Sequence, residues 1–184
     1  MTSTQVLRAQ QGDRDAFADL VRSAHDRLYA TAYRITRDRE AAEDAVQDAM
    51  VRCWRDIRGL RDPDRFEAWL YRLLINACRD QTRHARRRPV MVYGEPAEYP
   101  SSIDAFASMV EHDALERAFL KLPAEQRIAL VLAHYLGYSA PEIATIVGVP
   151  TGTVYSRLHY GARAMRAALS PAPAGAASPT EWTR

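Results

Sequence analysis

The sequence predicts an all-α protein with two small helical domains joined by a flexible linker. Apolar residues recur at helical spacing along most of the chain, and no stretch of useful length alternates as a β-strand does. Residues 89–107 contain several prolines, a glycine and paired serines, which is typical of a linker. We therefore expect domains at residues 1–88 and 108–169, followed by a disordered tail at residues 170–184.

Capping residues mark where the first helices begin. A short helix is expected from Thr2 to Gln11. Asp13 then has the position of an N-cap for a long helix, and Asp38 has that of an N-cap for a third helix, from about Arg39 to Ile57. The spacing predicts a fourth helix after a loop at Gly59–Arg65, with a buried face that comprises Phe66, Trp69, Leu70, Leu73, Ala77 and Gln81.

The third helix has a second organised face besides its core face. Its members follow helical spacing and combine acids, an amide, an arginine and one apolar residue: Asp44, Gln47, Asp48, Val51 and Arg55. Such a stripe can be a solvated surface. Because Val51 stands among acids, we favour a docking face for a basic partner.

The fourth helix, from Arg65 to about Arg88, has a basic stripe opposite its apolar side. Arginine recurs at every seventh position, at Arg65, Arg72, Arg79 and Arg86, and Asn76 and Arg83 lie beside that line. A solvated face normally mixes charges, but acids are sparse here. The pattern predicts a surface that follows phosphates, and a plain solvated face is the alternative.

The stretch from residue 139 to residue 165 predicts a helix-turn-helix. Ser139 and Glu142 have the spacing of a capping box, and Gly148 and Pro150 mark the turn. Val154, Leu158, Ala162, Met165 and Leu169 recur on one face of the second helix, and its outward face carries Thr153, Ser156, Arg157, Tyr160 and Arg163. These donors suit phosphates and base edges, so we predict DNA binding. The alternative is a helical hairpin that only packs.

The composition argues against several other classes of protein. The net charge is only +2, but this average hides a segregation, because acids and bases lie on different segments. No apolar run is long enough to span a membrane, and the two cysteines lack metal or redox spacing. We expect a cytoplasmic protein with reduced cysteines, no metal, no cofactor and no membrane contact of its own. Neither a phosphate loop nor a nucleophile–base set indicates an enzyme.

Three stretches together resemble one family: EDAVQDAMVRCWRDI, RFEAWLYRLLINACRDQTRHARRR and LPAEQRIALVLAHYLGYSAPEIATIVGVPTGTVYSRLHYGARAM. They look like an extracytoplasmic-function sigma factor, and the resemblance covers nearly all of residues 10–169. It implies that the first domain binds core RNA polymerase and opens the downstream (minus-ten) promoter element. The second domain would read the upstream (minus-thirty-five) element. With no further domain expected after Leu169, a separate anti-sigma protein is the implied regulator.

The resemblance also implies roles for individual residues. By resemblance, the face of the third helix that contains Asp44 and Val51 would bind core RNA polymerase. The Gly59–Arg65 loop with Asn76 would hold a flipped base, while the arginine stripe holds the backbone of the same strand; Trp69 is expected in the core. The implied upstream reading set is Thr153, Tyr155, Ser156, Arg157, Tyr160 and Arg163.

The chain departs from the family at the start of its recognition helix. Tyr155, Tyr160 and Ala162 stand where basic residues are usual, so the upstream element read here is expected to differ from the common one. Tyr160 packing against neighbouring helices is an alternative to an outward ring. A DNA-binding regulator that acts without polymerase is the alternative function. The sequence leaves open whether the two domains pack together in the free protein.

Overall fold

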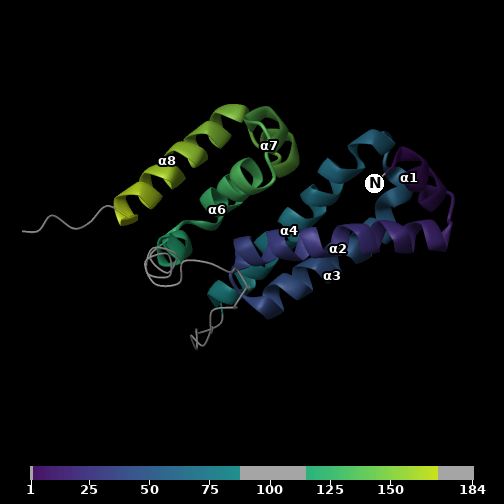
Figure 1. Ribbon diagram of the computed structural model, residues 1–184, viewed down its shortest axis with the longest axis horizontal. Coiled ribbons are helices and arrows are strands. Elements are labelled where there is room, and N and C mark those ends of the chain that lie inside the picture. The colour runs from purple at the N-terminus through teal and green to yellow at the C-terminus, as the bar shows by residue number, and fades with distance from the viewer. Residues whose placement is uncertain (1, 88–114, 170–184) are drawn as a thin grey trace, which may run out of the picture.

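The protein consists of helices in every part of the chain that the structure describes. The computed structural model describes residues 2–87 and 115–169, so the expected linker, the expected tail and the first residues (108–114) of the second expected domain lie outside the described residues. We call residues 2–87 the N-terminal unit and residues 115–169 the C-terminal unit (Figure 1). The prediction of an all-α fold is confirmed for these two ranges, which contain no strand.

The N-terminal unit has four α-helices. They are α1 (Ser3–Gln10), α2 (Arg14–Thr36), α3 (Arg39–Asp56) and α4 (Phe66–Arg87), with the 3-10 turns η1 (Ile57–Gly59) and η2 (Pro63–Arg65) between the last two. The expected caps are confirmed. The carboxylate of Asp13 accepts a hydrogen bond from the backbone N–H of Ala16 at 3.0 Å, and that of Asp38 accepts one from Ala41 at 2.8 Å. Local chemistry therefore fixes both helix starts.

The core of the N-terminal unit lies where α2, α3 and α4 meet. From α3 it contains the expected Ala42, Ala45, Val46, Ala49 and Cys53. On α4 the predicted face was partly wrong. Phe66, Leu70 and Ala77 are buried as expected, but Trp69, Leu73 and Gln81 are only half-buried. The structure buries four further α4 residues, Tyr71, Leu74, Ile75 and Cys78, because α4 packs against both α3 and the C-terminal unit.

The C-terminal unit comprises a helical stretch at residues 115–121, then α6 (Ala124–Leu130), a π-helical segment η3 (Val131–Tyr135), α7 (Ala140–Val147) and α8 (Thr151–Leu169). The helix-turn-helix has the expected capping box and the expected turn. The backbone N–H of Ser139 donates to Glu142 at 2.8 Å, and Gly148 adopts a left-handed φ of 72°. Gly161 lets α8 approach α6 closely, since a Cβ there would lie 3.0 Å from Leu130 Cδ1.

The two units pack against each other in the free chain, a point that the sequence left open. Helix α7 lies against α4, and α6 lies against α2 (Figure 1). The ring of Tyr138 meets that of Tyr71 edge-on at 5.9 Å, and Arg34 covers the ring of Tyr135 at 3.8 Å. One hydrophobic cluster includes buried residues of both units. The helices that carry the predicted binding faces are therefore held in one arrangement.

Candidate nucleic-acid and protein interfaces

The predicted docking face of α3 is open to solvent. All five of its members, Asp44, Gln47, Asp48, Val51 and Arg55, are exposed, and Val51 is 59% exposed. Trp54 lies next to this face and is 45% exposed, with its ring edge-on to Phe17 at 4.7 Å. The sequence argument overlooked Trp54, although a large aromatic residue beside an exposed valine is itself a signal of a docking surface. We use the name α3 face for these six residues.

Charge pairs on the α3 face stay within the helix. Arg55 donates to Asp56 through two hydrogen bonds, at 2.8 and 3.0 Å, which raise the pKa of Arg55 and lower that of Asp56. Asp48 lies 3.7 Å from Arg52. Asp48, Arg55 and Asp56 are exposed, so these pairs restrain their side chains weakly. The face combines an apolar centre with acids that a basic partner could meet.

A shallow groove of about 320 Å³ lies where α4 begins. Leu60, Ala68 and Trp69 give it an apolar floor, and Arg65 and Arg72 line its rim. We call this cavity the α4 groove. Trp69 was expected in the core rather than at a stacking position. It is half-buried and lines the groove, with its ring 6.0 Å from that of Phe66. An apolar floor beside two exposed guanidinium groups fits an unstacked base and its phosphates.

The arginine stripe of α4 is not continuously exposed, which corrects the sequence prediction. Arg65, Arg72 and Arg83 are exposed, and Arg83 is paired with Asp80. Arg79, however, is only 20% exposed. It turns toward the C-terminal unit, which covers the middle of the stripe. The side chain of Arg86, near the end of α4, lies outside the described residues.

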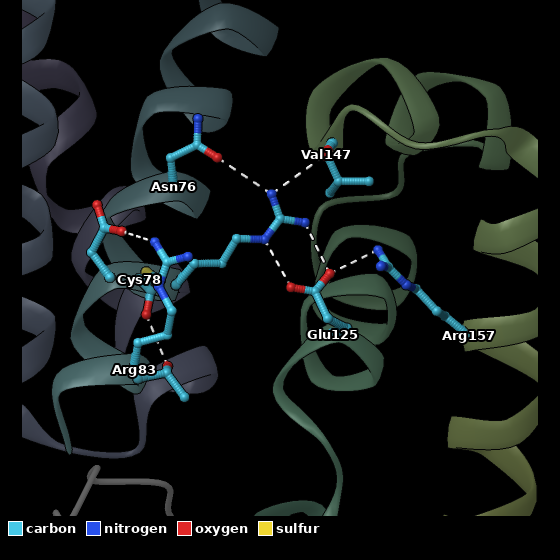
Figure 2. Close-up of polar contacts among 9 residues, drawn as sticks. Asn76, Cys78, Arg83, Glu125, Val147 and Arg157 are labelled. Atoms are coloured by element: carbon cyan, nitrogen blue, oxygen red, sulfur yellow. Dashed lines mark hydrogen bonds and ion pairs between the residues drawn. The ribbon is translucent and has the colours of Figure 1, made fainter. Parts of the chain in front are cut away.

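Arg79 is bound through three groups. Its Nε and Nη2 donate to the two carboxylate oxygens of Glu125 at 2.8 and 2.9 Å. Its Nη1 donates to Asn76 Oδ1 and to the backbone oxygen of Val147, both at 3.3 Å. Asn76, the residue predicted to read a base edge, is therefore half-buried and already has a partner (Figure 2).

Helix α8 exposes most of the residues that the sequence predicted to contact the upstream element. Tyr155, Ser156, Tyr160 and Arg163 are exposed, and Thr153 is half-buried. Tyr160 is 56% exposed with its ring edge-on to His159, so the alternative in which it packs into the core is not what the structure has. Arg157 departs from the prediction of an outward face. It is 21% exposed, and its Nη1 lies 2.7 Å from Glu125 Oε2.

One carboxylate thus holds two predicted DNA-binding arginines. Figure 2 shows Glu125 between α4, which carries Asn76, and α8, which carries Arg157. Burial raises the pKa of Glu125, but the hydrogen bonds from Arg79 and the charges of Arg79 and Arg157 outweigh it, so the pKa lies below its ordinary value. Sequence reasoning missed Glu125, because an acid in the first turn of a helix has an ordinary explanation in the helix dipole. We call Glu125, Arg79 and Arg157 the Glu125 clasp.

The potential metal ligands and the cysteines of the described residues do not form a metal site or a reactive thiol site. No group of three or more His, Cys, Asp or Glu residues within residues 2–87 and 115–169 is arranged to hold a metal ion. Cys53 and Cys78 are free, and burial raises the pKa of each thiol to about 12. Within the same ranges, no helix combines the length and apolar character needed to cross a membrane.

Comparisons with known proteins agree with this geometry. The model of sigma-70 region 2 matches residues 20–88, and that of sigma-70 region 4 matches residues 112–165. The ECF RNA polymerase sigma factor SigM of Mycobacterium tuberculosis is 39% identical over 148 residues, which cover 79% of this chain and 73% of SigM. SigW of Bacillus subtilis is 30% identical over 183 residues, which cover 92% of this chain and 97% of SigW.

Solved structures of sigma factors also resemble the fold of this chain. CnrH, in complex with the cytosolic domain of CnrY, matches with a TM-score of 0.67 at 27% identity, over 91% of this chain and 96% of CnrH. RpoE of Bartonella quintana, in complex with the anti-sigma factor NepR, matches with a TM-score of 0.66 at 26% identity, over 83% of this chain and 96% of RpoE.

Two helical units that match region 2 and region 4, in that order, define a sigma factor of the sigma-70 type. The chain belongs to the extracytoplasmic-function family of RNA polymerase sigma factors. It is a transcription initiation factor and not an enzyme. Membership of this family supports the predicted function, and it argues against the alternative of a regulator that works without polymerase.

Proposed function

We propose that three faces of the chain divide the work of promoter-specific initiation. The α3 face binds core RNA polymerase, the α4 groove with its arginines contacts the downstream element, and α8 reads the upstream element. The observation that supports this division is that the faces lie on three different helices and none of them overlaps another. Each face has the chemistry that its partner requires.

The α3 face suits a protein partner. Val51 and Trp54 offer apolar area at its centre, and Asp44 and Asp48 add negative charge at its rim. Protein interfaces commonly combine an aromatic anchor with a polar rim, and charges on the rim steer the encounter and select the partner. Core RNA polymerase would meet this face with a basic, partly apolar surface.

The α4 groove suits a single strand of DNA. A base that has left the duplex can stack on the apolar floor at Trp69, while Arg65 and Arg72 bind the flanking phosphates. Asn76 lies one helical turn beyond Arg72, and its amide offers both a donor and an acceptor to a base edge. Arg83 extends the phosphate contacts further along α4, and Arg79 would join them when its present partners release it.

Helix α8 suits the major groove of a duplex. Tyr155, Ser156, Tyr160 and Arg163 project from its exposed side, where a recognition helix meets base edges. The two tyrosines can donate a hydrogen bond or contact a thymine methyl group, but they cannot bind guanine bidentately as arginine does. We expect an upstream element that is less rich in contacted guanines than arginines at these positions would select.

Regulation by a separate protein is part of the proposal. The relatives CnrH and RpoE were solved with the cytosolic domain of CnrY and with the anti-sigma factor NepR. We expect an anti-sigma protein to bind this chain as well. Because the chain must meet both polymerase and promoter DNA, we place it in the cytoplasm.

Transcription in vitro tests the proposal. The chain is combined with core RNA polymerase on a library of randomised promoters, and the initiating templates are sequenced. Wild type should enrich two separated elements. Asn76→Ala should relax selectivity at one base of the downstream element by about 1–3 kcal/mol. Initiation without any enriched element, or an Asn76→Ala profile that equals wild type, would contradict the assignment.

A further inference from the structure

The Glu125 clasp joins groups that belong to two different readers. Arg79 comes from α4 of the N-terminal unit, and Arg157 comes from α8 of the C-terminal unit. Both guanidinium groups lie within 2.9 Å of the same carboxylate. Asn76 is tied to the clasp through Arg79. A single side chain on α6 therefore restrains three residues of the proposed DNA-binding surface.

The packing around the clasp also places α7 along one side of the α4 groove. Thr145 and Ile146 of α7 line this groove together with Trp69 and Arg72. The backbone oxygen of Val147 takes a further hydrogen bond from Arg79. In this arrangement α7 occupies space beside the groove that a strand of DNA would need, and the charge of Arg79 is neutralised by Glu125.

The distance between the promoter elements makes the packed arrangement incompatible with reading both. Elements named for positions minus ten and minus thirty-five are separated by about 85 Å of duplex at the usual rise per base pair. Arg79 and Arg157 cannot reach sites so far apart while they share one carboxylate. The two units must separate before both elements are bound.

We propose that the packed arrangement is an autoinhibited state of the factor and that the Glu125 clasp holds it closed. This inference rests on the proposed function, because it assumes that α4 and α8 are the DNA readers. In the closed state the clasp withholds Arg79, Arg157 and Asn76 from DNA. Separation of the units releases Arg79 and Asn76 and removes α7 from the α4 groove, while Arg157 stays paired with Glu125 inside the C-terminal unit until DNA competes for it.

The contacts that hold the two units together in the closed state include partly exposed ion pairs, so the units can separate. Among the described residues, ion pairs that bridge the units include Arg79 with Glu125 at 2.8 Å and Arg37 with Glu116 at 2.6 Å, and both involve partly exposed groups. The edge-on contact of Tyr71 with Tyr138 adds an apolar part. A ligand opens such a state when it binds the open form more tightly, and the open fraction sets the apparent affinity for DNA.

The test uses the full chain with the clasp charge removed. Glu125→Gln keeps the shape of the side chain and loses the charge that both arginines bind. Glu67→Gln is the matched control: it removes one acid from α4, whose partner Arg27 lies 3.2 Å away in the same unit. Binding to a short random-sequence duplex at low ionic strength is measured by fluorescence anisotropy, and the radius of gyration is measured by small-angle X-ray scattering.

We expect Glu125→Gln to bind the duplex about fivefold or more tightly than wild type and to have a larger radius of gyration. Glu67→Gln should match wild type in both. If either quantity is unchanged in Glu125→Gln, the clasp does not hold an inhibited state. Circular dichroism confirms that each variant keeps its helices.

A third variant separates this inference from the proposed function. Arg163 is exposed on α8 and takes no part in the clasp. Arg163→Ala should weaken duplex binding whether or not Glu125 is intact. If Arg163→Ala binds as wild type does, the assignment of α8 as a DNA reader fails. If Arg163→Ala weakens binding but Glu125→Gln has no effect, only the autoinhibition fails.

Discussion

The ring of Tyr138 meets the ring of Tyr71 edge-on, with 5.9 Å between centroids and an angle of 77° between the planes. Tyr71 belongs to α4 and is buried, whereas Tyr138 precedes α7 and is half-buried. Burial raises the pKa of both phenols. This pair is the aromatic part of the contact between the two units, and it gives that contact a component that salt does not screen.

Truncation of Tyr138 should therefore cost stability. Tyr138→Ala removes the aromatic contact and some buried area, so we expect a loss of about 1–2 kcal/mol in the free energy of unfolding. Urea denaturation followed by circular dichroism measures it. Tyr155→Ala is the control, because Tyr155 is 61% exposed and its loss should change stability little. Equal effects of the two substitutions would mean that the contact between the units contributes nothing.

The lowered pKa of Glu125 sets the pH range in which the clasp persists. A carboxyl group whose pKa is lower in the folded state stabilises that state above its unfolded pKa, and the stabilisation is lost as pH falls through the folded pKa. The clasp should thus remain closed through neutral and mildly acidic pH and open only below the usual glutamate pKa of about 4.3.

This pH dependence can be measured as the difference in radius of gyration between wild type and Glu125→Gln. We expect a constant difference from neutral pH to about pH 5 and a decrease below about pH 4. A difference that disappears near the ordinary histidine pKa of about 6.5 would show that another group controls the clasp.

Tyr160 gives a prediction for the upstream reader. Tyr160→Arg adds a phosphate or guanine ligand on the exposed side of α8, so it should tighten binding to upstream DNA and steepen the salt dependence by about one unit. It should also shift preference at one or two bases. Binding to upstream variants at several salt concentrations measures both effects. Tyr160→Phe is the control and should keep the wild-type slope; an unchanged slope in Tyr160→Arg would place Tyr160 away from DNA.

Local features of the fold could be predicted from the sequence because short-range interactions determine them. The caps at Asp13 and Asp38, the capping box at Ser139 and the left-handed turn at Gly148 each depend on residues within one helical turn. The exposure of the α3 face, except at Trp54, could be predicted for the same reason, since helical spacing alone separates that face from the core.

The clasp could not be predicted, because it is a tertiary contact. Arg79 and Glu125 are 46 positions apart, and nothing in the spacing of the α4 arginines distinguishes Arg79 from Arg72. Periodicity predicted that both would be exposed, but the approach of α7 and α6 to α4 leaves Arg79 only 20% exposed, while Arg72 stays exposed. The same approach explains why the core face of α4 is broader than its apolar pattern indicated, as the burial of Tyr71 shows.

The central claim is that the α3 face binds core RNA polymerase, and the affinity of the chain for purified core enzyme tests it most directly. Asp48→Arg reverses a charge on this face, and Asp19→Arg is the control, since Asp19 is exposed on α2 and pairs only with Arg22 among the described residues. We predict that Asp48→Arg raises the dissociation constant about tenfold or more, while Asp19→Arg equals wild type. If Asp48→Arg binds core enzyme as tightly as wild type, the α3 face is not the docking surface.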